Sequence, residues 1–271
     1  MSKSNRERSR AERAAAALAE QQRAESRRKL LVGGGIVLAL LLIIGVGLII
    51  QSQRDTTGDD AATPGNPTPT TSDSSSPSSG TGRLQVAPAD TYGLGVGDPD
   101  APVKVEVYED FLCPVCKAFE AASKEDLRQA AQDGKVYLVY RPVAFLAQFG
   151  PYTAQALNTY AVVQDKAGAQ AALKVHDLLY DEQPSESGPF PDNDWLVEKA
   201  VAAGAKEADV RAGIEDLTFE QWGQNANDEA SKAGATGTPY VLVNGEKFEP
   251  GEVTSWDAYA DALMAAIDDA Q

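Results

Sequence analysis

The chain contains 271 residues with a formal net charge of −16, and 43% of its residues are hydrophobic. This acidic balance argues against a nucleic-acid-binding protein, because the phosphate backbone attracts basic surfaces. Only two cysteines and one histidine are present, too few nitrogen and sulfur ligands for a zinc site of the usual kind. The composition therefore predicts neither a polyanion-binding protein nor a metalloprotein.

The first segment, residues 1–29, is basic and rich in alanine. It carries nine Lys or Arg and four Glu, a net charge of +5, so the rest of the chain carries −21. Its composition favours helix, and its positive charge would hold it at an anionic membrane surface. We expect a solvated cytoplasmic segment here rather than a binding site for a specific partner.

Residues 30–50 are an uncharged apolar run of 21 residues. As a helix, this run would extend about 30 Å, the thickness of the hydrocarbon core of a bilayer. The next 30 residues contain one basic residue, Arg54, so the positive-inside rule places the N-terminus in the cytoplasm and the C-terminal bulk outside. A cleaved signal peptide is the alternative, but residues 51–54 offer no small-residue cleavage site. The run predicts a single-pass signal anchor in the cell membrane.

Residues 51–82 are dominated by Pro, Ser, Thr and Gly. Such a segment cannot offset the entropy lost on ordering, so we expect it to be disordered. A flexible chain of this length reaches roughly 30 Å, which suits a tether. The remaining 189 residues, 83–271, are enough for one domain with a hydrophobic core.

The domain opens with an irregular stretch and a strand. An alternating apolar pattern predicts the strand at 103–108. Before it, Gly93, Gly95 and Gly97 superficially suggest a phosphate-binding loop. These glycines precede a strand rather than a helix, so we expect a turn.

Cys113 and Cys116 are the only cysteines of the chain. Cys113 opens a predicted helix with Pro114 in its first turn, where the missing N–H has no cost. Helix geometry can hold the two sulfurs within bonding reach, so the pair can cycle between dithiol and disulfide. A structural disulfide is one alternative, although so short a loop gains only about 2 kcal/mol from closure. Adventitious cysteines are another, and we favour redox chemistry in the oxidising space outside the membrane.

The remaining pattern is mainly helical with strands at its borders. It predicts a strand (136–140), a helical block (about 146–233) with breaks at 184–193 and Gly204, two short strands (240–243 and 246–248) and a last helix (255–267). Asn244 and Gly245 join the two short strands and are a strong hairpin signal.

Two motifs accompany this order of elements. They read Glu-Asp-Phe-Leu-Cys-Pro-Val-Cys-Lys at 109–117 and Thr-Gly-Thr-Pro-Tyr-Val-Leu-Val-Asn-Gly at 236–245. Together they resemble the DsbA-like branch of the thioredoxin superfamily over roughly residues 95–271. The predicted anchor and tether resemble the membrane-bound actinobacterial members of that branch. The resemblance implies an α/β thioredoxin fold with a helical insertion at about 146–233.

The resemblance also implies roles for individual residues. In this family the first cysteine, here Cys113, is the exposed nucleophile, and the second, here Cys116, is the buried resolving thiol. A cis-proline that faces the disulfide matches Pro239, and Thr238 before it would offer backbone groups to a bound peptide. A helix N-terminus lowers the pKa of a cysteine through its unpaired N–H groups and the helix dipole, which agrees with an attacking thiolate at Cys113.

Two positions depart from the family pattern. The strong oxidases of the family carry His inside the motif, whereas this chain has Val115, which neither donates a hydrogen bond nor carries charge. Glu109 and Asp110 add like charge nearby, so we expect a higher Cys113 pKa and a less oxidising disulfide than in the His-containing relatives. Many relatives also have an acid where this chain has Val107, placed to pass a proton to the second thiol. Here that relay is absent, or a water or Glu109 replaces it.

Other candidate residues have plainer interpretations. His176 lies in a predicted helix, far in sequence from both cysteines, so we interpret it as structural rather than catalytic. The many acidic residues are expected mainly at the solvated surface. Trp195, Trp222 and Trp256 are expected in the core.

These observations predict a membrane-tethered, extracytoplasmic protein disulfide oxidoreductase without metal or other cofactor. It would oxidise thiols of unfolded exported polypeptides through Cys113 and Cys116. The resemblance implies a membrane redox partner of the DsbB or VKOR type. The nearest alternative is the reverse reaction, a reductase or isomerase, which Val115 keeps open. A non-catalytic binding module of the same fold is the other alternative, and the Cys113→Ser variant separates a catalyst from such a module.

Overall fold

The computed structural model describes residues 58, 61–65 and 84–271. No helix within these ranges is both long and apolar enough to cross a membrane. The basic segment (1–29) and the membrane span (30–50) that the sequence predicts lie outside the described residues. Most of the predicted tether does as well.

The small described part of the predicted tether contacts the folded domain. Gly58 exchanges two hydrogen bonds with the Asn225 side chain, at 2.9 and 3.0 Å. The N–H of Gly65 donates to Asp165 at 2.8 Å, and Pro64 is buried. These contacts were not expected from a composition with almost nothing to bury.

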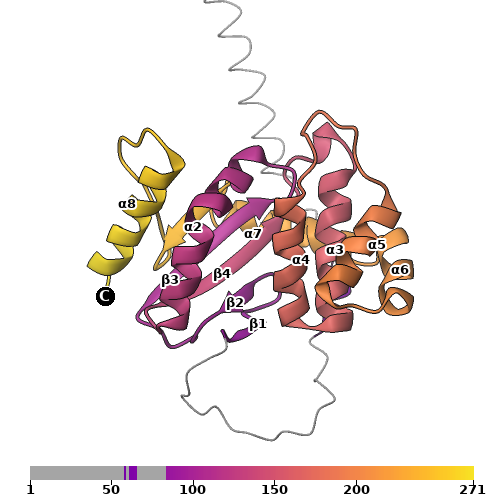
Figure 1. Cartoon of the computed structure of the whole chain (residues 1–271), viewed down its shortest axis with the longest axis horizontal. Coiled ribbons are helices and arrows are strands. Elements are labelled where there is room, and N and C mark those ends of the chain that lie inside the picture. The colour runs from indigo at the N-terminus through magenta and orange to yellow at the C-terminus, as the bar shows by residue number, and fades with distance from the viewer. Residues whose placement is uncertain (1–57, 59–60, 66–83) are drawn as a thin grey trace, which may run out of the picture. The chain divides into compact units, whose positions relative to one another are not determined.

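A six-stranded sheet with the order β1-β2-β4-β3-β5-β6 forms the centre of the domain (Figure 1). The central strands β3 and β4 run parallel, and every other neighbouring pair is antiparallel. The bounds are β1 (Val86–Pro88), β2 (Leu94–Val96), β3 (Val103–Asp110), β4 (Val136–Val143), β5 (Tyr240–Val243) and β6 (Glu246–Lys247). Every residue of β3 except Lys104 is buried, as expected of a strand covered on both faces.

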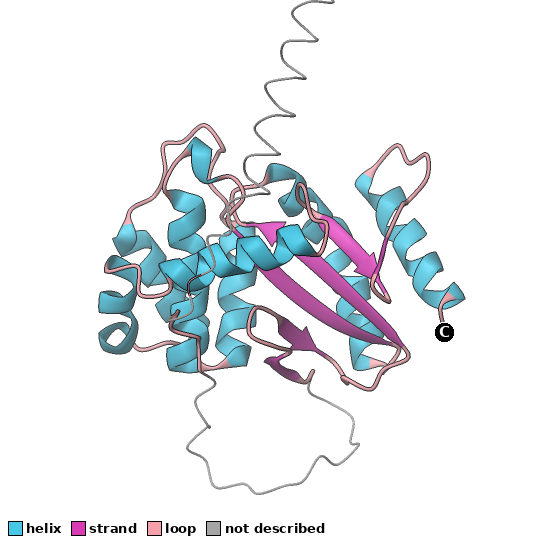
Figure 2. Ribbon diagram, turned by 180° about the vertical axis from the view of Figure 1, so that it is seen from behind, coloured by secondary structure: helices cyan, strands magenta, loops and turns pink. Residues whose placement is uncertain are grey.

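Helices cover both faces of this sheet. α2 (Pro114–Gln132) packs on β4 and beside α8 (Trp256–Asp269), and α7 (Glu220–Lys232) crosses the opposite face, as the view from behind shows (Figures 1 and 2). α2 buries Phe119 and Leu127. The predicted thioredoxin-like α/β architecture is confirmed.

The helical block beside the sheet is also confirmed. It comprises a short 3-10 turn, η1 (Ala147–Phe149), and the helices α3 (Tyr152–Ala167), α4 (Ala169–Asp181), α5 (Asn193–Ala203) and α6 (Glu207–Glu215), followed by α7. The predicted breaks lie where expected, between α4 and α5 and at Gly204, whose φ is 114°. An additional break at Gly168, with φ 85°, separates α3 from α4 and was not predicted.

The predicted turn at Gly93–Gly97 is wrong, because residues 94–96 form strand β2. Leu94 and Val96 are fully buried, and β2 pairs with the central strand β4. Gly95 lies between them, where a Cβ would overlap the Tyr137 side chain. The glycine therefore serves close packing in a strand rather than a reversal of the chain.

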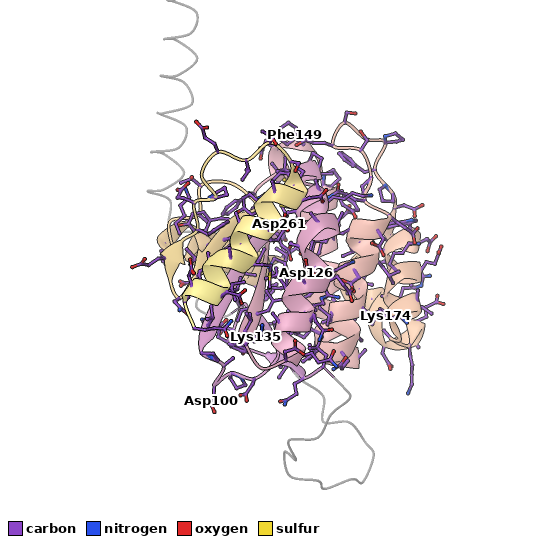
Figure 3. The ribbon with its side chains drawn as sticks, turned by 60° about the vertical axis from the view of Figure 1, so that its left-hand side comes forward. Asp100, Asp126, Lys135, Phe149, Lys174 and Asp261 are labelled. Carbon is purple, nitrogen blue, oxygen red and sulfur yellow. The ribbon has the colours of Figure 1, made fainter. Side chains whose placement is uncertain are left out.

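Most polar side chains lie at the surface and most apolar ones in the core, but some tryptophans and acidic residues differ from the expectation. Asp126 on α2 and Asp261 on α8 lie on the outside of their helices (Figure 3). Trp222 is a buried core residue as predicted, whereas Trp195 and Trp256 are only partly buried against the core. Within the part of the chain that the structure describes, four acidic residues are buried instead of solvated: Glu106, Glu109, Asp110 and Glu120. Three of these lie around the cysteine pair.

Candidate active site

The cysteine pair lies where the end of β3 leads into α2. Cys113 is the N-cap residue, with an extended backbone (φ −72°, ψ 115°), and Pro114 follows in the first turn. The Cys113 Sγ accepts the N–H of Cys116 at 3.4 Å. A side-chain oxygen usually satisfies such a free helix N–H, and here the sulfur of Cys113 does so. Both cysteines are free thiols.

The surroundings favour the thiolate of Cys113. A hydrogen bond with the Cys116 thiol is the largest influence and lowers the pKa of Cys113 to about 6, although burial acts in the opposite direction. Hydrogen bonds with Thr238 and with the N–H groups of Val115 and Cys116 lower this pKa further. Since a thiolate is the attacking species, Cys113 is activated at neutral pH.

Cys116 has the opposite character. Its side chain is fully buried, and burial raises its pKa well above the usual value. The negative charges of Cys113 and Glu109 add to this rise. The pair is thus split into a thiolate at Cys113 and a protonated thiol at Cys116, the division that the family resemblance implies.

The segment 238–239 faces the cysteine pair from the other side. The Thr238–Pro239 peptide bond is cis, as the resemblance implies. β5 pairs antiparallel with β3, with Tyr240 opposite Tyr108, and this register brings Thr238 to the cysteines. When Cys113 is protonated, its thiol donates to the Thr238 carbonyl at 3.5 Å, across 125 positions of sequence. The two motifs therefore form one site.

The exposure of Cys113 differs from the expectation of an exposed nucleophile. Only 6% of the residue is exposed, because it lies under the contacts with Cys116 and Thr238. The surface of the motif is instead formed by Pro114 and by Val115, which is 42% exposed.

Two residues that sequence reasoning missed hold the loop between β3 and α2. Gln183, just after α4, donates to the carbonyls of Phe111 and Cys113 at 3.1 and 3.0 Å. The buried Asp110 accepts from the N–H of Leu112, at 2.8 Å, among other groups. No local pattern marks Gln183, since its partners lie about 70 positions earlier in the chain.

A buried polar cluster lies behind the cysteines. It consists of Glu109 at the end of β3, Glu120 on α2 and His176 on α4, and their ligand atoms lie within 4.8 Å of one another. His176 is therefore not remote from the site, as its position in the sequence suggested. Glu120 follows Cys116 by four positions on the same helix face, a spacing that could have identified it. Val107 is a buried core residue, so the nearby acids are Glu109 and Glu120.

Comparison with known proteins agrees with this geometry. A thioredoxin family model matches residues 90–268. The "Probable disulfide bond formation protein D" of Bacillus cereus is 28% identical over 181 residues, which cover 64% of this chain and 76% of that protein.

Solved structures of Mycobacterium tuberculosis proteins are also similar. Reduced DsbG shares 31% identity with a TM-score of 0.53, covering 64% of this chain and 82% of that chain. Oxidised DsbA shares 29% identity with a TM-score of 0.53, covering 69% and 92%. With a site in which a split cysteine pair faces a cis-proline, these matches show that the chain belongs to the thioredoxin family as a DsbA-like protein disulfide oxidoreductase.

Proposed function

We propose that the protein is an oxidase that introduces disulfides into exported polypeptides outside the cell membrane, to which residues 30–50 anchor it. The observation that carries the direction of the reaction is the lowered pKa of Cys113, to about 6. Stabilising this thiolate stabilises the reduced pair, and a disulfide whose reduced form is stabilised is a better oxidant.

In the proposed reaction a substrate thiolate attacks the Cys113 sulfur of the Cys113–Cys116 disulfide. The bond between the cysteines breaks, and the Cys116 sulfur leaves with the electron pair and takes up a proton, as its raised pKa favours. A second substrate thiolate then attacks the substrate sulfur of the mixed disulfide and expels the Cys113 thiolate. The substrate loses two electrons, and the cysteine pair gains them.

Thr238 and two exposed apolar side chains support a polypeptide substrate. The Thr238 carbonyl lies beside Cys113, where it can pair with the backbone of an extended chain. Val115 and Phe149, which are 42% and 50% exposed, both follow the carboxyl ends of the central strands, and Phe149 lies at that end of the domain in Figure 3. An unfolded chain offers the apolar side chains that such exposed residues bind.

The location and the electron partner belong to the same proposal. The basic residues 1–29 and the apolar residues 30–50 support a cytoplasmic N-terminus and an extracytoplasmic domain. Family resemblance supports reoxidation by a membrane protein of the DsbB or VKOR type. A membrane-impermeant thiol reagent applied to intact cells should label reduced Cys113, and protection until lysis would contradict the location.

The reduction potential of the full-length chain in glutathione buffers tests the direction of the reaction. A value between about −120 and −180 mV, the range of DsbA and protein disulfide isomerase, is expected for an oxidase. A value near −270 mV, as in thioredoxin, would instead indicate the reductase that Val115 keeps open. A disulfide below about −300 mV that resists exchange would be a structural disulfide only, and the proposed function would be overturned.

A further inference from the structure

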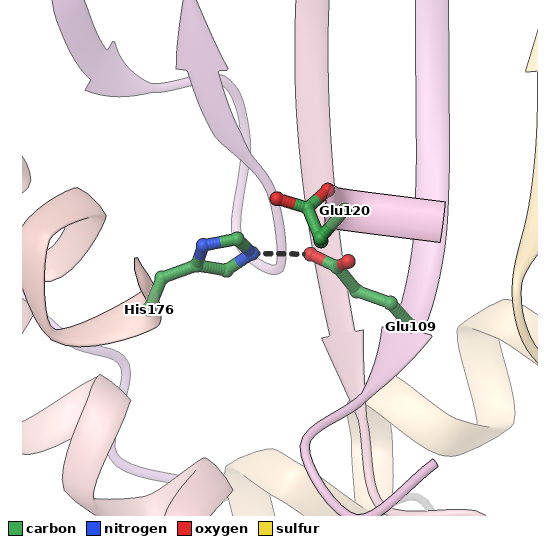
Figure 4. Close-up of side chains that lie close together, drawn as sticks. All are labelled: Glu109, Glu120 and His176. Atoms are coloured by element: carbon green, nitrogen blue, oxygen red, sulfur yellow. Dashed lines mark hydrogen bonds and ion pairs between the residues drawn. The ribbon is translucent and has the colours of Figure 1, made fainter. Parts of the chain in front are cut away.

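Among the described residues, Glu109, Glu120 and His176 form a cluster of three side chains of types that bind metal ions. The three side chains are at most 2% exposed and come from three elements, β3, α2 and α4. They converge on one point (Figure 4).

Most carboxylate oxygens of this cluster lack hydrogen-bond partners. Glu109 Oε1 lies 2.5 Å from His176 Nε2, but Glu109 Oε2 and both oxygens of Glu120 have no hydrogen-bond partner in the described structure. Arg128, on the same helix as Glu120, donates instead to Asp177 and Tyr140. Burial raises the pKa of Glu120, so without a cation this carboxyl group holds a proton. Its two buried oxygens lack partners in either form, and a cation beside Glu120 would displace the proton and bind them.

The histidine is oriented to bind such a cation. His176 Nδ1 lies 3.2 Å from Asp177 Oδ1, and two hydrogen bonds of 2.8 and 2.7 Å from Arg128 hold this carboxylate. Because a carboxylate only accepts, the Nδ1 that faces Asp177 carries a hydrogen. In the metal-free protein Nε2 also carries a hydrogen, which it donates to Glu109, and a metal ion would displace that proton and bind the Nε2 lone pair. A carboxylate that orients a histidine in this way is the usual support of a metal-binding imidazole.

We propose that Glu109, Glu120 and His176 bind one divalent transition-metal ion, with Zn²⁺ as the best match. One imidazole nitrogen and two carboxylate oxygens are ligands that Zn²⁺ accepts, whereas Ca²⁺ and Mg²⁺ require more oxygen ligands than the cluster offers. Two carboxylates and a neutral imidazole carry a charge of −2, which a divalent ion neutralises. A proton shared by Glu109 and His176 would leave Glu120 without a partner.

The geometry allows this ion with small movements. Ligand atoms at about 2.1 Å from a common ion lie roughly 3–4 Å apart, so shifts of about 1 Å or less convert the observed cluster into a site. The ion would link the central sheet, the cysteine-bearing helix and the helical insertion. This role is structural and does not depend on the proposed direction of thiol exchange.

Zinc binding by the full-length chain tests the proposal. The parent for this test carries Cys113→Ser and Cys116→Ser, so that thiolates cannot bind the metal, and it is purified in detergent with a tag that contains no histidine. After treatment with a chelator, Zn²⁺ is titrated by calorimetry, and bound metal is counted by mass spectrometry after desalting. One Zn²⁺ per chain is expected, with a melting temperature that rises with Zn²⁺ concentration because the folded state binds the ion.

Matched variants assign the ligands. Glu120→Gln keeps the size of the side chain and should weaken zinc binding at least tenfold, as should His176→Gln. Glu125→Gln, on the exposed side of the same helix, should bind as the parent does. A parent that retains no Zn²⁺ and melts at the same temperature with and without it overturns the proposal, whatever the variants do. So does a folded Glu120→Gln protein with the affinity of the parent.

Discussion

At the residue scale, the chemistry depends on a sulfur in the position of a helix cap. The Cys113 Sγ accepts the N–H of Cys116, and burial opposes but does not cancel the effect of the hydrogen bonds on its pKa. Cys116, three positions later, is buried and has a raised pKa. One turn of helix therefore separates two thiols of the same type into an attacking group and a protonated group.

This separation predicts how the reduced protein reacts with iodoacetamide. Alkylation of Cys113 should follow its thiolate fraction, with a midpoint near pH 6, since hydrogen bonds lower its pKa to about 6. Cys116 should remain unmodified in the folded protein because it is fully buried. Mass spectrometry of quenched samples measures both sites. A rate that rises only near pH 9, the ordinary thiol value, would show that the cap does not stabilise the thiolate.

A substitution at Val115 should shift the reduction potential of the Cys113–Cys116 disulfide. Val115 is 42% exposed, so Val115→His should fold normally and place a hydrogen-bond donor beside the thiolate. The pKa of Cys113 should fall below 6, and the disulfide should become more oxidising by about 30 mV for each pKa unit. Val115→Leu, which adds no donor, is the control. Equal potentials for the two variants would mean that this position does not act on Cys113.

The residues of the site were predictable where the signal was local. The Cys-x-x-Cys spacing identified the cysteines, and the second motif identified Pro239. Gln183 and His176 were not identified, because helical insertion residues reach the site only through tertiary packing. The proposed metal ligands could not be found in the sequence either, because only the fold brings Glu109 and Glu120 together with His176.

At the scale of elements, Asp110 connects the sheet to the helical insertion. It ends β3, and its two oxygens accept from Thr153 Oγ1 on α3, at 2.6 Å, and from the N–H groups of Leu112 and Leu146. Burial is the largest influence on its pKa, which is raised. The loop before Cys113 is thus held by a carboxylate that depends on donors from two other segments.

Removing one of these donors should destabilise the domain. Thr153→Val keeps the shape of the side chain but leaves the buried Asp110 with one donor fewer, at a cost of about 1–3 kcal/mol. Thr159→Val on the same helix is the matched control, because Thr159 is also buried but donates only to the carbonyl of Gln155 one turn earlier. Chemical denaturation of both variants measures the difference. Equal losses would show that the link to Asp110 adds nothing beyond the hydroxyl group itself.

The elements that the sequence predicted have strong local patterns. The strand at 103–108 alternates, and the Asn244–Gly245 hairpin requires the positive φ values that these residues adopt, 51° and 83°. β1 and β2 have three residues each and no such pattern. β2 is held by pairing with β4, more than 40 positions away, and among the described strands β1 pairs only with β2, so a local pattern cannot reveal either strand.

At the scale of the whole molecule, the redox state of the cysteine pair is linked to folding stability. The oxidised protein gains about 2 kcal/mol from the short loop that the disulfide closes in the unfolded chain. The reduced protein instead gains the stabilisation of the Cys113 thiolate, which exists only in the folded state. Which form is more stable therefore depends on pH.

The sign follows from the shift of the Cys113 pKa, from 9.0 to about 6 on folding. A group whose pKa is lowered in the folded state contributes stability that is fully present above the unfolded value and lost as the pH falls through the folded value. Between pH 6 and 9 the stability of the reduced form should thus rise relative to the oxidised form, by at most about 1.4 kcal/mol per pH unit. Above pH 9 the raised pKa of Cys116 acts in the opposite direction.

Thermal or chemical unfolding of both redox forms of the full-length protein across this pH range measures the difference between their free energies of unfolding. We expect the stability of the reduced form to rise relative to that of the oxidised form as the pH increases from 6 to 9, because only the reduced protein carries the thiolate at the helix N-terminus. Cys113→Ser should show no such rise, since it retains Cys116 but lacks the group that titrates. If the stability of the reduced form relative to the oxidised form stays constant or falls between pH 6 and 9, folding does not stabilise the thiolate, and the physical basis for an oxidising disulfide is lost.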